Sequence, residues 1–128
     1  MVTSLEIRPA AVPYLLILAG GFFGAVLRFL ADRQVPSLAG TLLVNFTGCI
    51  AMGIFMYESI YIGAFSRDTR IFFGIGAIGA YTTFSALAVQ SFEAGPVIGS
   101  ANIAANLLAG FLGVLAGRYI ISRHRGVS

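Results

Sequence analysis

Residues 74–85 read GIGAIGAYTTFS, and this composition is unusual for a membrane-spanning helix. Three glycines and three serine or threonine residues fall within these twelve positions, and the two threonines are β-branched. Such a sequence does not favour a continuous helix, because glycine and β-branched residues both lower helix propensity. We therefore predict an unwound turn near residues 79–83. The alternative is an unbroken helix that packs through its glycines and bonds its hydroxyls back to its own carbonyls.

The chain around this stretch has the composition of a membrane protein. Of its 128 residues, 58% are hydrophobic and 10% are charged, whereas a soluble domain carries about 25% charged residues. This argues against a soluble enzyme, a nucleic-acid-binding protein and a disordered tail. The net charge of +3 rests on eight basic residues, all of them arginine. That pattern is typical of loops at a membrane surface rather than of a nucleic-acid interface.

Four uncharged windows are long enough to cross a bilayer, which takes about 20 apolar residues in a helix. The fold class predicted from them is an all-α membrane protein with four transmembrane helices, the third broken in mid-membrane. A single domain covers residues 1–128, and the predicted spans are approximately 10–31, 38–62, 71–92 and 96–121.

The arginines are divided unevenly between the two predicted sides of the membrane. One side carries Arg8, Arg67, Arg70, Arg118, Arg123 and Arg125. The other side carries Arg28 and Arg33. The excess predicts that both termini are cytoplasmic. Insertion of the chain in both orientations stays open as an alternative.

Polar side chains within the spans are the candidate functional groups, because placing a polar residue in hydrocarbon costs free energy and such residues commonly serve a function. Asn102 and Asn106 are four residues apart and therefore share one helix face. The candidates for a polar track through the bundle are Asn45, Thr82, Thr83, Ser85, Asn102 and Asn106. The alternative is that these groups only form hydrogen bonds between helices, which is common in membrane bundles.

The residue types available within the spans favour a passive pore over an enzyme or a pump. The four uncharged windows contain no acidic residue, and a small proton-coupled exporter needs an ionisable group in the membrane. No arrangement of serine, histidine and acid suggests nucleophilic catalysis. Neutral donors, aromatic edges and backbone carbonyls remain. A broken helix frees carbonyls that can bind a small hard cation, and its half-helix N-termini favour anions.

Two GxxxG pairs indicate close helix contacts, since glycine lets helix backbones approach one another. The pairs are Gly20 with Gly24 and Gly113 with Gly117. Packing inside the chain and contact with a second subunit are both open.

Three motifs together resemble the Fluc/CrcB family of fluoride channels. They are GGFFGAVLRF at 20–29, GTLLVNFTG at 40–48 and GAYTTFS at 79–85. Each is modest alone, but their order and spacing in a four-span chain are specific.

The resemblance implies an antiparallel dimer of four-helix subunits in a prokaryotic plasma membrane, surrounded by lipid, with two narrow pores that let fluoride leave the cytoplasm. It implies a structural Na⁺ bound at the dimer centre by the backbone carbonyls of Gly79 and Thr82. The residues that it implies for the fluoride pathway are Asn45, Phe84, Ser85, Thr83, Asn102 and Asn106. Arg28 matches the arginine of the first motif, where it either attracts anions at a vestibule or pairs with Asp32.

The sequence departs from the family pattern at two positions. Leu87 stands where the pattern has a second phenylalanine, and Gln90 stands where it has a glutamate. Leucine keeps the bulk of the ring but lacks its electropositive edge. Three arrangements follow from this departure: a conducting homodimer, a heterodimer with an oppositely inserted homologue, or an accessory subunit without a pore of its own.

Overall fold

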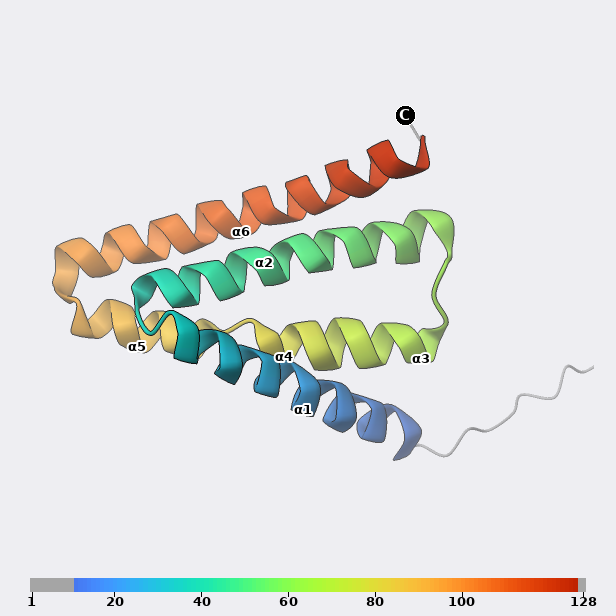
Figure 1. Cartoon of the computed structure of the whole chain (residues 1–128), viewed down its shortest axis with the longest axis horizontal. Coiled ribbons are helices and arrows are strands. Elements are labelled where there is room, and N and C mark those ends of the chain that lie inside the picture. Colours follow the sequence, from blue (N-terminus) through green and yellow to red (C-terminus); the bar gives the residue numbers. More distant parts are fainter. Residues whose placement is uncertain (1–10, 127–128) are drawn as a thin grey trace, which may run out of the picture.

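Four helical spans run alternately in opposite directions, so the start of the first, the end of the last and the connection after residue 62 lie at one end (Figure 1). The computed structural model describes residues 11–126, and Arg8 and residue 10 lie outside that range. The elements are α1 (Ala11–Gln34), α2 (Leu38–Tyr57), η1 (Glu58–Ile62), α3 (Arg67–Thr69), η2 (Arg70–Ile78), α4 (Gly79–Tyr81), α5 (Phe84–Glu93) and α6 (Gly95–Arg125).

The prediction of an all-helical chain with four membrane-spanning segments is confirmed by their length and apolar composition. These segments are Ala11–Gln34, Leu38–Ile62, Arg67–Glu93 and Gly95–Arg125. The third begins four residues before the predicted position 71, because Ser66 caps it: the Ser66 hydroxyl accepts a hydrogen bond from the Thr69 N–H at 3.2 Å. A cap, rather than the last charged residue, therefore sets this helix start.

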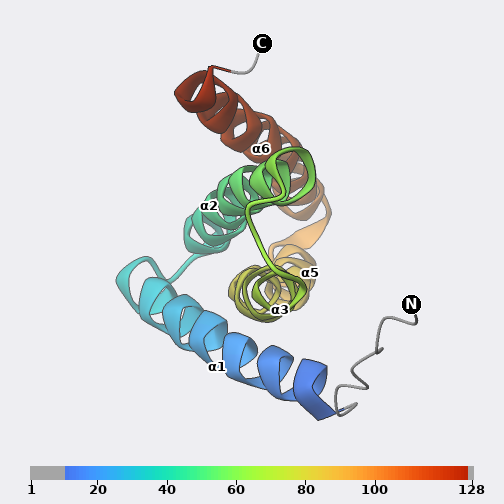
Figure 2. The ribbon, with the colours of Figure 1, turned by 90° about the vertical axis from the view of Figure 1, so that its right-hand side faces the viewer.

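Glycines bring the spans together in two pairs. Helix α6 packs along α2, and α1 packs across the third span (Figure 2). A Cβ atom at Gly117 would collide with the carbonyl oxygen of Ile50 in α2, and one at Gly24 would collide with that of Ala77. Both GxxxG pairs are thus used for packing inside the chain, which resolves the alternative left open by the sequence.

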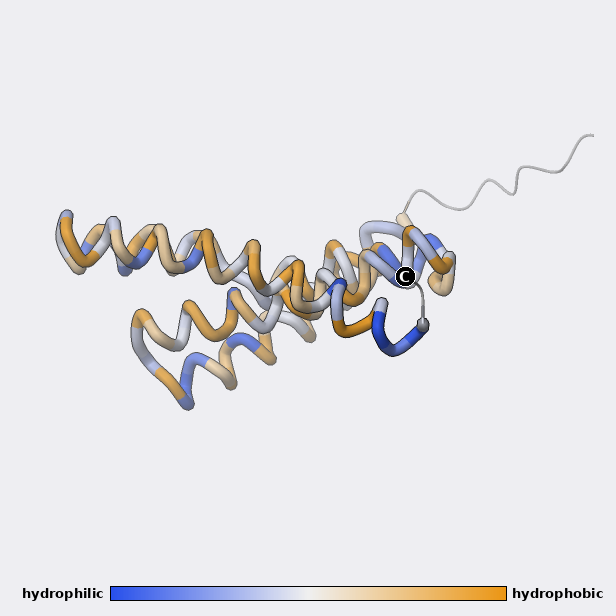
Figure 3. The backbone as a smooth tube through the Cα atoms, turned by 90° about the horizontal axis from the view of Figure 1, so that it is seen from above, coloured by the Kyte–Doolittle hydropathy of each residue, from blue (hydrophilic) through white to orange (hydrophobic). Residues whose placement is uncertain are grey.

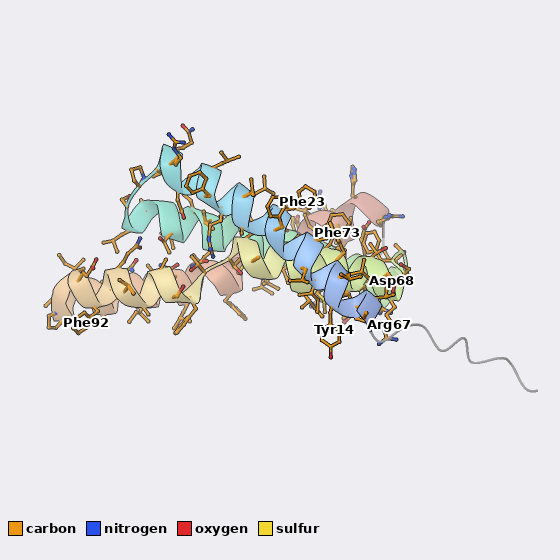
Figure 4. All side chains as sticks on the ribbon, turned by 90° about the horizontal axis from the view of Figure 1, so that it is seen from below. Tyr14, Phe23, Arg67, Asp68, Phe73 and Phe92 are labelled. Atoms are coloured by element: carbon orange, nitrogen blue, oxygen red, sulfur yellow. The ribbon has the colours of Figure 1, made fainter. Side chains whose placement is uncertain are left out.

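Most large apolar side chains are exposed, and hydrophobic residues recur along the helical segments (Figure 3). Tyr14 is 69% exposed and Phe92 is 89% exposed, and both point away from the bundle in Figure 4. The buried positions are instead held mainly by glycine and by small polar residues. This distribution suits a chain whose surroundings are hydrocarbon, where the outside needs no polar cover.

An ion pair closes the end of the bundle where α6 terminates. Arg125 donates to the Glu58 carboxylate at 2.8 Å, which joins the last turn of α6 to η1. Three basic residues occupy that last turn, where cations interact favourably with the helix dipole. Gly126 then ends the helix in the left-handed conformation, with a φ of 63°.

Candidate ion pathway at the interrupted third span

The third span is interrupted between α4 and α5. Thr82 and Thr83 both have extended backbones, with φ/ψ angles of −73°/156° and −144°/121°. Gly79 remains helical at −61°/−36°, so the interruption is shorter than the turn predicted over residues 79–83. The physical reason is that β-branched threonine readily adopts extended angles, so the chain needs no glycine at the turn itself.

The interruption diverts two amides that a continuous helix would use internally. The Thr83 N–H would donate to the Gly79 carbonyl in an unbroken helix, but it donates to Asn45 Oδ1 at 2.8 Å. The Ala86 N–H likewise donates to Thr83 Oγ1 at 3.2 Å, which makes Thr83 the N-cap of α5. The carbonyls of Gly79 and Thr82 therefore lose their usual helical donors.

Asn45 holds the extended backbone of Thr83 from both sides. Its Oδ1 accepts from the Thr83 N–H, and its Nδ2 donates to the Thr83 carbonyl at 3.0 Å. The second Asn45 N–H donates to Asn106 Oδ1, also at 3.0 Å. One side chain thus satisfies both polar backbone groups of a residue that has left the helix. Both N–H groups of Asn45 are engaged within the chain.

Two further contacts seat the interruption on α2. The Thr47 hydroxyl donates to the Leu43 carbonyl at 2.8 Å, so its oxygen is left to accept from the Tyr81 hydroxyl at 3.0 Å. Gly48 lies against Thr82 and the Tyr81 ring, and a Cβ there would collide with the Thr82 methyl group. Helix α2 therefore carries the groups that fix both sides of the interruption.

We expect Tyr81→Phe to destabilise the chain by about 1 kcal/mol, the usual net worth of one hydrogen bond. The change removes only the hydroxyl that reaches Thr47. Thermal unfolding in detergent measures the effect. Tyr119→Phe is the matched control, because Tyr119 is 59% exposed and its ring contact with Arg123 survives the substitution. Equal unfolding temperatures for the two variants would contradict a role for the Tyr81 hydroxyl in seating the turn.

A chain of amides continues from Asn45 into α6 and α5. Asn106 Nδ2 donates to the carbonyl and to Oδ1 of Asn102, at 3.1 and 3.2 Å. Asn102 Nδ2 then donates to Ser91 Oγ at 2.9 Å. Sequence reasoning missed Ser91. The sequence held only a partial signal, the spacing of four residues that places Thr83, Leu87 and Ser91 on one side of the segment.

An open groove of about 480 Å³ lies over the interruption, between α2, α5 and α6. Its lining comprises Asn45, Cys49, Thr82, Thr83, Phe84, Leu87, Asn106, Leu107, Gly110, Phe111 and Val114. Phe84 is 78% exposed, whereas Leu87 is 4% exposed and packs within the chain. The Thr83 and Ser85 hydroxyls are 3.3 Å apart and share one hydrogen bond. The groove therefore combines a few polar groups with a largely apolar lining, beside the exposed ring of Phe84.

Other predicted residues lie apart from this groove. Gly79 lines a separate groove on the face that includes Arg67 and Arg70. Arg28 is half-buried on α1, and within residues 11–126 it forms no ion pair with Asp32. In the same range, the Gln90 side-chain oxygen is buried without a hydrogen-bond partner.

Comparison with known proteins identifies the family. The family model described as CrcB-like protein, Camphor Resistance (CrcB), matches residues 15–118. The chain belongs to the CrcB-like family. This confirms the resemblance based on the three motifs. A relative from Methanospirillum hungatei JF-1, named Fluoride-specific ion channel FluC 1, is 56% identical over 106 residues, covering 83% of this chain and 76% of the relative.

Two of the relatives come from a single organism, Methanosarcina acetivorans. The one named Fluoride-specific ion channel FluC 2 is 44% identical over 106 residues, 83% of this chain and 84% of the relative. The one named Fluoride-specific ion channel FluC 1 is 45% identical over 84 residues, 62% of this chain and 64% of the relative.

Proposed function

We propose that this chain is a subunit of a passive, fluoride-selective channel that lets fluoride leave the cytoplasm and so relieves its toxicity. The observation that carries the proposal is the 56% identity, over 83% of the chain, to a protein named as a fluoride-specific ion channel. As a channel subunit, the protein is not an enzyme. The accessory-subunit alternative is not favoured by the names of these relatives.

The interruption offers hydrogen-bond donors to a small anion. Thr83 and Ser85 share one hydrogen bond, so one of their two hydroxyl protons stays available whichever of them donates. The first turn of α5 adds the positive end of a helix dipole. Phe84 adds the electropositive edge of an exposed ring. Such neutral donors can replace the water shell that fluoride loses on entering a narrow pore.

Asn45 combines two roles in this proposal. It fixes the extended turn through Thr83, and it offers an N–H to a passing anion in exchange for its bond to Asn106. Asn106 donates to Asn102 in turn, so the amide donors along the proposed pathway form an ordered row. Asn106 lines the groove, and Asn102 therefore continues the pathway beyond it.

A second subunit is needed to enclose the pathway, and we propose an antiparallel dimer in the plasma membrane. The groove is open and Phe84 is largely exposed, so one chain does not surround an ion. Leu87, in place of a ring, and the unequal distribution of arginine support a heterodimer. The pair of relatives in Methanosarcina acetivorans supports the same arrangement. A homodimer is the competing arrangement.

The turn also fits a bound Na⁺ at the centre of such a dimer. The carbonyls of Gly79 and Thr82 lose their helical donors, and carbonyl oxygen is a suitable ligand for a hard cation. Gly79 is exposed, so a second chain could add further oxygens. The ion would supply positive charge that holds two inverted subunits together and favours anions nearby.

The proposal predicts that the purified chain, alone or with a co-expressed homologue, carries fluoride down its gradient out of liposomes. A fluoride electrode measures the efflux, and chloride-loaded liposomes are the control for selectivity. Efflux from the chain alone would establish a conducting homodimer, and efflux only with the homologue would establish a heterodimer. Absence of efflux in both preparations, or uphill efflux driven by a pH gradient, would contradict a passive channel.

A further inference from the structure

The amide chain that starts at Asn45 leaves two donors unused at its far end. The amide of Asn45 donates to Thr83 and Asn106, and the amide of Asn106 donates twice to Asn102. Asn102 gives one N–H to Ser91 Oγ. Within residues 11–126, the second N–H of Asn102 and the hydroxyl proton of Ser91 have no acceptor.

These two donors are buried. Ser91 is 5% exposed and Asn102 is 9% exposed, and a buried donor without an acceptor costs free energy. Helix α6 approaches α5 closely here, since a Cβ at Gly99 would collide with the Ser91 carbonyl oxygen. This close approach buries the two donors. Glycine at this position therefore lets Asn102, one turn later, reach Ser91.

Ser91 also borders an open cavity of about 520 Å³ between the end of α5 and the start of α6. The lining is uncharged and consists of Ala88, Ser91, Phe92, Gly95, Pro96, Gly99, Ser100 and Ile103. The Ser100 hydroxyl is already engaged with the Val97 carbonyl of its own helix at 3.0 Å. Ser91 is thus the lining hydroxyl that remains free to donate into this space.

The amide chain has a single direction. Asn106 and Asn102 each turn Oδ1 toward the interruption and Nδ2 toward Ser91. Aligned dipoles of this kind place their positive end at Ser91, and hydrogen bonds in a row reinforce one another. The far end of the chain therefore favours a ligand that is negatively charged and accepts hydrogen bonds.

We propose that Ser91 Oγ and Asn102 Nδ2 form a second binding position for fluoride, beyond the groove at the interruption. The position rests on the proposed channel function and extends it, because it gives an ion leaving Asn106 a next pair of donors. Ser91 is the residue that this inference adds to the pathway.

The test measures fluoride efflux from liposomes that contain full-length Ser91→Ala. We expect efflux to fall about tenfold, the order of effect for losing one hydrogen bond to a charged group. Ser91→Thr keeps the hydroxyl and should retain most of the wild-type rate. Ser100→Ala is the matched control, because it removes a hydroxyl from the same cavity that is already satisfied within α6; its efflux should match wild type.

Wild-type efflux from Ser91→Ala, or equally slow efflux from the alanine and threonine variants, would overturn the inference and leave the channel function intact. If Ser91→Ala does not fold, Ser91→Cys replaces it, since a thiol is similar in size but a weak donor. Wild-type efflux from a folded Ser91→Cys would also overturn the inference. A wild-type protein that carries no fluoride, with or without its homologue, would overturn the proposed function and the second position together.

Discussion

Asn45→Asp is expected to reduce fluoride efflux by about a hundredfold or more. The carboxylate would lose the donors to Thr83 and Asn106, each worth about 1 kcal/mol net, and would add a half-buried charge that costs several kcal/mol more. A carboxylate also repels the anion that the amide would bind. If the acid is protonated instead, its single O–H still cannot serve both acceptors.

The measurement is the initial rate of fluoride release from liposomes at equal protein content. Gln34→Glu is the matched control, since it makes the same change from amide to acid at an exposed position near the end of α1. We expect that variant to conduct as wild type does. Unchanged efflux from Asn45→Asp would remove Asn45 from the pathway and leave it without a functional role.

Gly117→Ala is expected to destabilise the chain by about 1–3 kcal/mol, the range for overpacking a close contact. The added methyl group would collide with the Ile50 carbonyl oxygen. Helices α2 and α6 would have to separate, and the same pair of helices carries the bond between Asn45 and Asn106. Fluoride efflux should therefore fall together with stability.

The matched control for Gly117→Ala is Gly110→Ala on the same helix. A Cβ at Gly110 lies 3.5 Å from Cys49 Sγ, which is an ordinary contact. Alanine also has a helix propensity that is about 1 kcal/mol better than that of glycine. Thermal unfolding in detergent should show Gly110→Ala to be as stable as wild type or slightly more stable. Equal stability of the two variants would contradict the importance of the Gly117 contact.

The sequence predicted the architecture well because hydrocarbon imposes simple rules. Four uncharged windows had to become helices, since only internally bonded backbone can cross a bilayer. The three motifs by themselves resemble the family to which the chain belongs. The composition of residues 74–85 also indicated an interruption, and its two threonines lie where the backbone leaves the helix.

The sequence could not predict which partner each polar side chain would find. The interruption lies at Thr82 and Thr83, past the last glycine, because Asn45 from another helix binds the Thr83 backbone. That contact joins residues 38 positions apart, and its geometry depends on how α2 packs. Ser91 was missed for the same reason: only the contact between α5 and α6 brings it to Asn102.

The outward-facing phenylalanines and leucines, together with the glycines and asparagines inside, invert the usual pattern of tolerance to substitution. When one bulky apolar side chain replaces another on the lipid face, the new side chain still lies in apolar surroundings, so the exchange costs little. Adding a single carbon atom at Gly24 or Gly117 forces two backbones apart. Over generations the smallest residues of this chain should therefore change least, while its largest ones vary with little consequence.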